Sequence, residues 1–349
     1  MYTPQFKITN TILTNIGIIE AAREVINRAP LLPYYEKKFQ EDALVRTVHY
    51  GTHIEGNELD LTQAEKVVQG QTIIARERDI QEVINYRKVM EYLDEIDTSS
   101  KPLDESLIKH MHTLVVEHVI PEETAGIYRR PSVVIRNSHT GEIVFRPPQA
   151  VIVPFQIADL LEYLNITKPE DLHPVLKAGI AHYEFVRIHP FVEGNGRLAR
   201  ALSTLILFRE GYDIRKFFSL EEFFDKDLPA YYGALQSVEK NNSDLTEWLE
   251  YFTKALAVEL TRIKEKVEKI SADGKIKQKL GGKPFLMSER QMKIVEFIQE
   301  NGYLENKAFK SLFPMISEDS ILLDLKSLIN AGVIRKQGVT KGVKYVMNS

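Results

Sequence analysis

The sequence predicts a mainly α-helical protein with more than one domain. Apolar residues recur at helical spacing through most of the 349 residues. Two short β-type runs, at 132–136 and 142–145, interrupt that pattern near the middle of the chain. A polar, glycine-containing stretch at 271–284 then precedes a smaller C-terminal unit, and a chain of this length has room for two or three domains.

Helices account for most of the chain before residue 271. Pro30 and Pro33 close the first helix, and Pro174 lies in the first turn of a later one, where proline is well tolerated. The expected ranges are 18–27, 34–50, 62–69, 80–96, 104–119, 156–164, 171–188, 220–238 and 245 to about 270.

The two β-type runs predict a hairpin. Residues 137–141 would form its turn, with Gly141 near the end of that turn. A lone hairpin in a helical domain is marginally stable, so it needs a structural or functional reason. Two interpretations remain open: a surface excursion, or an edge strand that pairs with an extended peptide.

Residues 271–284 are expected to be a linker, and the unit after it resembles a winged helix-turn-helix. Helices are predicted at 289–300, 306–312 and 317–331, followed by strands at 333–336 and 343–346. Residues 273–349 contain 13 Lys/Arg and 8 Asp/Glu, a net charge of +5 against −9 for the rest. This balance suits DNA, but Glu318, Asp319 and Asp324 on the expected recognition helix disfavour phosphate contact. DNA binding and protein interaction both stay open.

The composition excludes several classes of protein. The chain has no cysteine, so disulfides, thiolate catalysis and cysteine metal sites are excluded. There is no P-loop and no kinase-type glycine loop. No apolar run approaches the length of a membrane span, and the N-terminus lacks the basic start of a signal peptide, so a cytoplasmic location and no membrane partner are expected.

The most informative segment is HPFVEGNGRLAR at 189–200. His189 is a proton acceptor with an ordinary pKa near ~6.5. Glu193 offers the one hard oxygen ligand that Mg²⁺ needs when phosphates and water supply the rest. Gly194 and Gly196 let backbone N–H groups approach an anion, because no Cβ stands in the way.

A helix is expected after Asn195 and Gly196, and its N-terminus would direct unpaired N–H groups at the same anion. Arg197 and Arg200 are three residues apart, hence neighbours on one helix face. The segment matches HPFx[D/E]GNGRxxR at every fixed position and in this resembles Fic-domain proteins. The alternative, a helix–loop–helix corner with surface arginines, leaves the histidine, the glutamate and the glycines unexplained.

The resemblance covers roughly residues 35–270 and implies a Fic-type helical bundle with a β-hairpin flap. Fic proteins transfer AMP from ATP to a protein hydroxyl, so ATP and Mg²⁺ are the implied cofactors. The implied roles are general base for His189, Mg²⁺ ligand for Glu193, anion hole for Gly194, Asn195 and Gly196, and phosphate contacts for Arg197 and Arg200, with Arg200 at the γ-phosphate.

Two more sets of residues follow from the resemblance. The hairpin lies where the family has its flap, so Val133, Val134, Ile135 and Arg136 would dock the target segment as an added strand. Tyr231 and Tyr232 are candidates for stacking on adenine. Two adjacent tyrosines on a helix cannot both face one pocket, however, and packing in the core is the alternative.

Residues 51–57, GTHIEGN, resemble the family's inhibitory helix, [S/T]xxxE[G/N]. Glu55 and Gly56 match the pattern, whereas the Ser/Thr position falls on Gly51, with Thr52 one place later. A Glu55 carboxylate that reaches Arg200 would form a charge-assisted pair, expected to be bidentate, in the space that the γ-phosphate needs. The alternative is that Glu55 simply ends a helix.

The sequence therefore predicts an autoinhibited enzyme that transfers AMP to a Ser, Thr or Tyr hydroxyl of a target protein. Alternatives are a Fic enzyme that transfers another group or removes AMP, and a DNA-binding regulator with a nucleotide-sensing core. A homodimer stays open. The expected domains are an N-terminal helical region with the inhibitory helix (1–100), a Fic core (101–270), the linker (271–284) and the winged helix (285–349).

Overall fold

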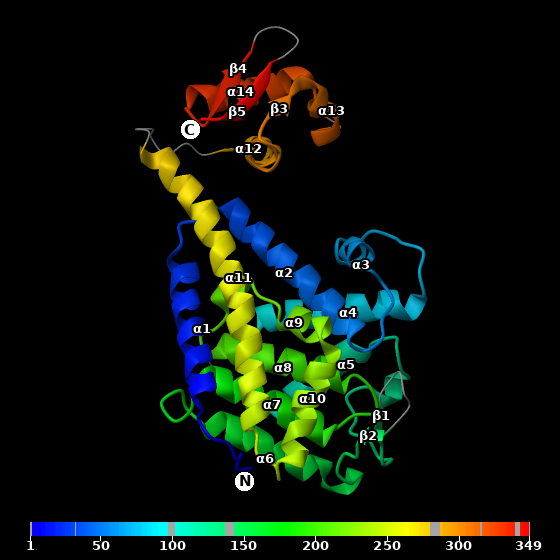
Figure 1. The fold of residues 1–349 in the computed structure, drawn as a ribbon. Coiled ribbons are helices and arrows are strands. Elements are labelled where there is room, and N and C mark those ends of the chain that lie inside the picture. The colour runs from blue at the N-terminus through cyan, green and yellow to red at the C-terminus, as the bar shows by residue number, and fades with distance from the viewer. Residues whose placement is uncertain are drawn as a thin grey trace. The chain divides into compact units, whose positions relative to one another are not determined.

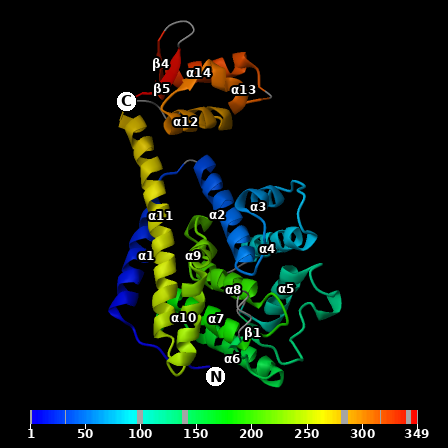
Figure 2. The ribbon, with the colours of Figure 1, turned by 45° about the vertical axis from the view of Figure 1, so that its right-hand side comes forward.

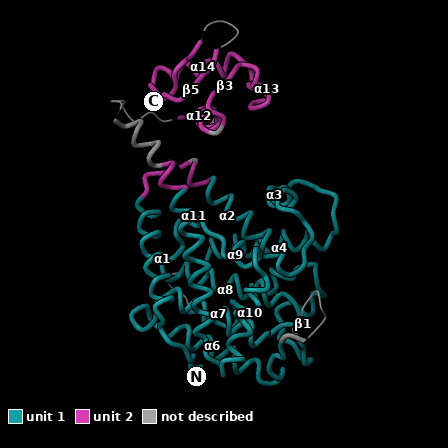
Figure 3. Tube along the Cα trace, viewed as in Figure 1, with its two compact units in different colours: residues 1–28, 38–265 teal, residues 29–37, 266–349 magenta. Residues whose placement is uncertain are grey.

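A computed structural model describes residues 2–31, 33–96, 102–136, 143–279, 287–314, 316–338 and 343–348. The protein is mainly helical (Figure 1), as predicted. It divides into two compact units, residues 1–28 with 38–265 and residues 29–37 with 266–349 (Figure 3). No helix in the described ranges combines the length and the apolar character needed to cross a membrane.

The centre of the first unit is a pair of packed helices, α7 (Pro174–Ile188) and α8 (Asn195–Arg209). All residues of α7 except Val186 and Arg187 are buried, which is the pattern of a helix surrounded by neighbours on every side. The loop that joins the two helices contains His189 and Glu193, so the most buried elements of the fold hold the signature. Neighbouring helices are α4 (Glu77–Glu95), α5 (Glu105–Val116) and α6 (Val153–Ile166).

Two long helices run side by side along this unit, α1 (Asn10–Arg28) and α11 (Thr246–Lys279), as the blue and yellow ribbons of Figures 1 and 2 show. The Asn15 amide donates to the Thr253 hydroxyl at 3.0 Å inside their contact. Helix α1 begins eight residues before the expected position 18. Helix α11 extends to Lys279, so residues 271–279, expected to be linker, are helical.

Helix α2 (Pro33–His53) leads to the 51–57 motif, and a buried arginine fixes it to the unit. The Arg46 guanidinium lies 2.8 Å from Glu222 Oε2 and 2.7 Å from Glu259 Oε1, and it also donates to the Phe217 carbonyl at 3.2 Å. Removal of one partner from such a buried ion cluster leaves an uncompensated charge. The position of α2 is therefore strongly specified. After α2 comes the short α3 (Leu61–Val68), which a capping box begins.

The prediction of one continuous helix at 220–238 is wrong, because the chain forms two helices there. These are α9 (Leu220–Lys226) and α10 (Leu228–Lys240). Pro229 cannot supply an N–H to a continuing helix, and the Asp227 carboxylate accepts from the Ala230 N–H at 3.1 Å as the cap of the new one. Short 3-10 segments occur at Glu122–Thr124, Ala150–Ile152 and Ile214–Lys216.

The hairpin is shorter than predicted. Its strands are β1 (Ile135–Arg136) and β2 (Ile143–Phe145), which pair antiparallel with a register irregularity. The turn expected at 137–141 lies outside the described residues.

The described part of residues 287–349, in the second unit, contains three α-helices and a three-stranded antiparallel sheet of order β3-β5-β4. The strand β3 was not expected. Two residues are too few to show an alternating pattern. The winged-helix interpretation and DNA binding stay predictions. The elements are α12 (Glu289–Asn301), β3 (Leu304–Glu305), a 3-10 turn (Asn306–Ala308), α13 (Phe309–Leu312), α14 (Glu318–Asn330), β4 (Ile334–Gln337) and β5 (Lys344–Met347).

Candidate active site

His189 ends helix α7 in the left-handed backbone conformation, with φ 50° and ψ 60°. A non-glycine residue adopts that conformation only when its surroundings enforce it. Its ring Nδ1 lies 3.2 Å from the Val186 carbonyl. Since a carbonyl can only accept, Nδ1 bears the hydrogen in that contact, and Nε2 of the neutral ring keeps its lone pair.

The ring of His189 is held in its neutral form. Burial lowers the pKa of His189 to about 4, an effect that the Val186 contact and the Glu55 charge oppose and the Arg129 charge assists. At neutral pH the side chain is therefore a free base, with Nε2 as the proton acceptor.

Arg129 fixes the segment before the hairpin to the same loop. Its Nε donates to the His189 carbonyl at 2.7 Å, and its other nitrogens donate to the carbonyls of Ile188 at 3.3 Å, Pro131 at 3.3 Å and Pro148 at 2.5 Å. Arg129 is 3% exposed, so the guanidinium is a buried bridge between the histidine and both flanks of the hairpin. This arrangement fixes the position of the hairpin relative to His189.

The loop after His189 is braced by an amide and requires a glycine. The Asn195 side chain forms two hydrogen bonds with the Phe191 backbone, each 2.9 Å long. Its amide oxygen accepts from the Phe191 N–H, and its amide nitrogen donates to the Phe191 carbonyl. Gly194 has φ 78°, and a Cβ there would lie 2.9 Å from Val115 Cγ1. The Asn195 side chain thus shapes the loop, and the N–H groups of the first turn of α8 remain to meet an anion.

His112 supports the loop from α5. Its Nδ1 accepts from the Gly126 N–H at 2.8 Å, so Nε2 carries the hydrogen and donates to the Glu193 carbonyl at 3.1 Å. The ring stacks on Phe191 at 3.6 Å between centroids, and burial lowers the pKa of His112 to about 4. His112 therefore acts as a neutral structural group.

Arg197 and Arg200 are buried in the first turns of α8, at 1% and 2% exposed. Nε and Nη1 of Arg197 and Nε of Arg200 have no hydrogen-bond partner within the described part of the chain. Buried donors of this kind are costly unless a ligand or water satisfies them. Together with the helix N-terminus they form a site suited to a polyanion.

Glu55 occupies part of this anion site. Its Oε1 lies 2.8 Å from Arg200 Nη2, and a Cβ built on Gly196 would come within 2.2 Å of the same oxygen. Burial raises the pKa of Glu55, but the charges of Arg200 and Arg197 outweigh that effect and the pKa is lowered. The carboxylate is therefore charged and lies directly over the first turn of α8.

The Glu55 contact differs from the expected bidentate pair. Arg200 Nη2 donates both to Glu55 and to the carbonyl of Gly51, the second contact also at 2.8 Å. A Cβ at Gly51 would lie 2.3 Å from Tyr86 Cε1, so no Ser or Thr fits where the family pattern has one. The departure of this sequence from the pattern thus has a steric cause, and the Gly51 carbonyl adds a contact to Arg200.

Glu193 projects a carboxylate that is 32% exposed. It accepts a hydrogen bond from Arg78 Nη2 on α4 and lies 3.6 Å from Arg197 Nη2. The described residues contain no group of three or more acidic or histidine side chains that could hold a metal. One accessible carboxylate still fits Mg²⁺ if phosphates and water complete the shell, because Mg²⁺ commonly takes one or two carboxylates with substrate phosphates.

The two tyrosines and the hairpin residues that the sequence predicted for the site differ in how exposed they are. Tyr231 is 2% exposed, stacks on Phe224 at 4.8 Å and contacts His182 Nε2 through its hydroxyl at 2.8 Å, as the packing alternative expects. Tyr232 is 39% exposed and stays a candidate for contact with a base. At the flap, Val134 is exposed and Val133 half-buried, while Ile135 and Arg136 form β1.

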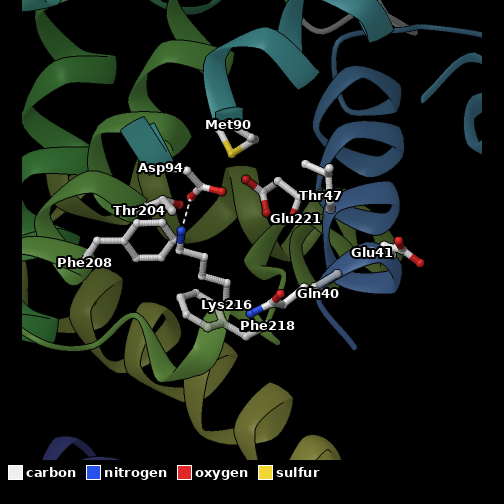
Figure 4. A pocket seen from close by; sticks show the side chains of 12 residues that line it. Gln40, Glu41, Thr47, Met90, Asp94, Thr204, Phe208, Lys216, Phe218 and Glu221 are labelled. Atoms are coloured by element: carbon white, nitrogen blue, oxygen red, sulfur yellow. Dashed lines mark ion pairs between the residues drawn. The ribbon is translucent and has the colours of Figure 1, made fainter. Parts of the chain in front are cut away.

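A separate cavity lies beside α2, α4 and α8 (Figure 4). Apolar side chains such as Met90, Phe208 and Phe218 line it, and the Lys216–Asp94 ion pair at 2.7 Å stands at its side. None of residues 189–200 contributes to its lining. The anion site is therefore placed by the signature and not by this cavity.

Sequence reasoning missed Arg78, His112 and Arg129. The helix predicted at 80–96 begins after Arg78, so the pair that Arg78 forms with Glu82, four residues further on, was not indicated. His112 lies on the helix predicted at 104–119, and the helical pattern does not show what its ring contacts. Nothing local distinguishes Arg129 from Arg130.

Part of the chain is similar to known proteins. Residues 102–207 match the Fic/DOC family. Protein adenylyltransferase fic-1 of Caenorhabditis elegans is 33% identical over 170 residues, 47% of this chain and 32% of that protein. Protein adenylyltransferase Fic of Drosophila grimshawi is 28% identical over 178 residues, 50% of this chain and 35% of that protein. The match thus covers about a third of the length of these relatives.

Solved structures share the fold. A Fic family protein from Desulfovibrio desulfuricans superposes with a TM-score of 0.67 at 24% identity, over 99% of this chain and 98% of the other. Fic-1 of C. elegans, residues 134–508, gives 0.61 at 24% identity, over 74% of each chain.

Proposed function

We propose, from the Fic/DOC family domain that the chain carries at residues 102–207, that the protein is an adenylyltransferase. It would move AMP from ATP to a Ser, Thr or Tyr hydroxyl of a target protein. The observation that carries the proposal is one arrangement on a short segment. A neutral histidine with a free Nε2 precedes a helix N-terminus with two buried arginines, and Nε and Nη1 of Arg197 and Nε of Arg200 have no hydrogen-bond partner among the described residues.

In the proposed reaction His189 Nε2 takes the proton of the target hydroxyl as its oxygen attacks the α-phosphorus of ATP. The new P–O bond forms while the bond to the β-phosphate oxygen breaks, and pyrophosphate leaves. Arg197, Arg200 and the N–H groups of α8 stabilise the phosphate charge. Mg²⁺ held by Glu193 would neutralise the developing charge of the pyrophosphate.

The hairpin would present the target. Among the described residues its sheet consists of β1 and β2, so each strand has an outer edge where an extended segment can add main-chain hydrogen bonds. Arg129 ties the flanks of this hairpin to the His189 carbonyl. Docking of a strand at the flap would therefore bring its hydroxyl to a fixed position near the base.

Inhibition by Glu55 is part of the proposal. The carboxylate lies over Gly196 and accepts a hydrogen bond from Arg200 Nη2, the donor assigned to the γ-phosphate. A negative charge there repels the polyphosphate and removes its arginine contact. ATP that binds beside it would be displaced from the geometry needed for in-line attack.

Transfer of label tests the function and separates its alternatives. In the presence of Mg²⁺, Glu55→Gly protein should incorporate radiolabel from α-³²P-ATP but not from γ-³²P-ATP. Its intact mass should rise by the mass of one AMP group. The double variant Glu55→Gly/His189→Ala should fold and remain unlabelled.

Label from γ-³²P-ATP would instead indicate phosphate transfer. No label from either nucleotide in folded Glu55→Gly protein, with and without candidate target extracts, would overturn the proposal and favour a nucleotide-sensing regulator. Loss of AMP from labelled protein after removal of ATP and pyrophosphate would reveal hydrolytic removal of AMP, with water as the acceptor.

A further inference from the structure

Arg78 places a positive charge on the carboxylate that is assigned to the metal. It lies in the first turn of α4, and its Nη2 hydrogen-bonds Glu193 Oε1 across 115 residues of sequence. Its Nε donates to Glu82 Oε1 at 3.1 Å. The guanidinium thus bridges two carboxylates, one from α4 and one from the signature loop.

Glu193 and three neighbouring side chains form a cluster in which the charges balance. Arg197 lies 3.7 Å from Glu82 Oε1 and 3.6 Å from Glu193 Oε1. Two guanidiniums therefore face two carboxylates, and the negative charge of Glu193 is already compensated by protein groups. Glu82 is 4% exposed, which anchors the cluster to the buried face of α4.

A divalent cation and Arg78 cannot share this arrangement. Mg²⁺ or Mn²⁺ binds a carboxylate oxygen at roughly 2.0–2.2 Å and repels a neighbouring guanidinium. Arg78 Nη2 already hydrogen-bonds Glu193 Oε1, so a cation bound at that oxygen would have to displace it. The Arg78 side chain is 48% exposed, so solvent screens the pair and the long side chain can swing aside.

We infer that Arg78 determines the affinity of the site for divalent cations, as an internal competitor for Glu193. This inference rests on the proposed function, because it takes Glu193 as the metal ligand. If Arg78 instead supported Glu193 as a ligand, its removal would change the cation affinity in the opposite direction. If Arg78 merely oriented Glu193, its loss would weaken cation binding, whereas a competitor's loss strengthens it.

The same part of α4 contacts the inhibitory segment. Asn57, two residues after Glu55, donates to the Asp79 carbonyl at 3.0 Å and to Glu82 Oε2 at 3.1 Å. Glu82 therefore joins the Arg78 bridge to the turn that presents Glu55.

The test measures Mn²⁺ binding by the EPR signal of the free ion, with the non-hydrolysable analogue α,β-methylene-ATP kept below the protein concentration. A titration of the analogue without protein gives the Mn²⁺ that the nucleotide itself chelates. A Glu55→Gly background keeps the anion site open in every variant. Arg78→Ala should tighten Mn²⁺ binding at least tenfold, and Arg78→Lys should fall between Arg78→Ala and the parent. Arg87→Ala removes the same charge from α4 at an ion pair with Glu91, and should stay within twofold of the parent.

Glu193→Gln should abolish the gain when combined with Arg78→Ala. Arg78→Gln keeps a donor of similar length without the charge, and replaces Arg78→Ala if thermal unfolding shows that the alanine variant is not folded. Unchanged or weaker Mn²⁺ binding in the Arg78 variants overturns the inference while leaving the transferase proposal intact. Absence of any Mn²⁺ binding that Glu193→Gln removes overturns both, and label transfer without the predicted tightening overturns this inference alone.

Discussion

The Glu55 carboxylate and the Arg200 guanidinium meet at 2.8 Å above Gly196, although 145 residues separate them in the sequence. The contact closes the N-terminus of α8 with a negative charge supplied by the protein itself. Whatever polyanion binds there must displace that carboxylate or accept a different position. The inhibitory proposal depends on this geometry.

Glu55→Gly should raise self-labelling from α-³²P-ATP by at least about tenfold, since a charge-assisted contact is worth roughly 1.5–3 kcal/mol. In an Arg200→Ala background the same change should give little further gain, because both effects pass through one contact. Glu58→Gly removes a nearby exposed charge and should leave the rate unchanged. Equal activation by the two glycine variants would argue against a specific latch.

The pH dependence of transfer should follow the lowered pKa of His189. A base whose pKa is about 4 stays neutral as the pH falls through ~6.5, where an ordinary histidine gains its proton. In Glu55→Gly protein the carboxylate that raises this pKa is gone, so the base should remain neutral to at least as low a pH. Label incorporation should therefore stay level from about pH 8 to about pH 5.5. A loss of rate with its midpoint near 6.5 would contradict the assignment.

Arg129→Lys should slow transfer at least about tenfold with little change in ATP affinity. A lysine has one nitrogen and cannot satisfy the four carbonyls that the Arg129 guanidinium contacts, so the His189 loop and the flap lose their common anchor. Calorimetric titration with the ATP analogue and the rate of label incorporation together separate these effects. Arg130→Lys, at the exposed neighbouring position, should transfer label at the rate of the parent. An equal loss of rate in both variants would show that the Arg129 contacts are not specifically required.

Gly51→Ala should destabilise the protein by about 1–3 kcal/mol, as expected when a well-packed contact is overfilled. The added Cβ would lie 2.3 Å from the Tyr86 ring, so the end of α2 must shift and carry Glu55 with it. Urea unfolding should show the loss of stability, and label incorporation should rise. Gly17→Ala in α1, where the Cβ meets nothing within 4 Å, should instead be neutral or stabilising. Unaltered stability in Gly51→Ala would show that the tight contact is relieved without movement.

Local patterns were enough to predict most helices of the first unit and the signature loop. Helical spacing of apolar residues indicates each helix without reference to its neighbours, and 189–200 is one continuous segment whose loop and helix keep its residues together. The errors occurred where a local signal was weak or misread. Asp227 and Pro229 start a new helix at a place where the apolar pattern continues. The strand β3 has two residues, too few for a period.

The sequence by itself determined the chemical groups of the site, because base, carboxylate, glycines and arginines stand next to one another in the chain. Only the tertiary structure decided which distant groups face them. Glu55 could be proposed from its motif, but its contact with Arg200, the Tyr86 ring that requires Gly51, and the Arg78 and Arg129 contacts depend on how α2, α4 and the flap pack against α7 and α8. A helical period shows which face of a helix is buried but not which helix covers it, so contacts between segments more than fifty residues apart emerge only from the packed fold.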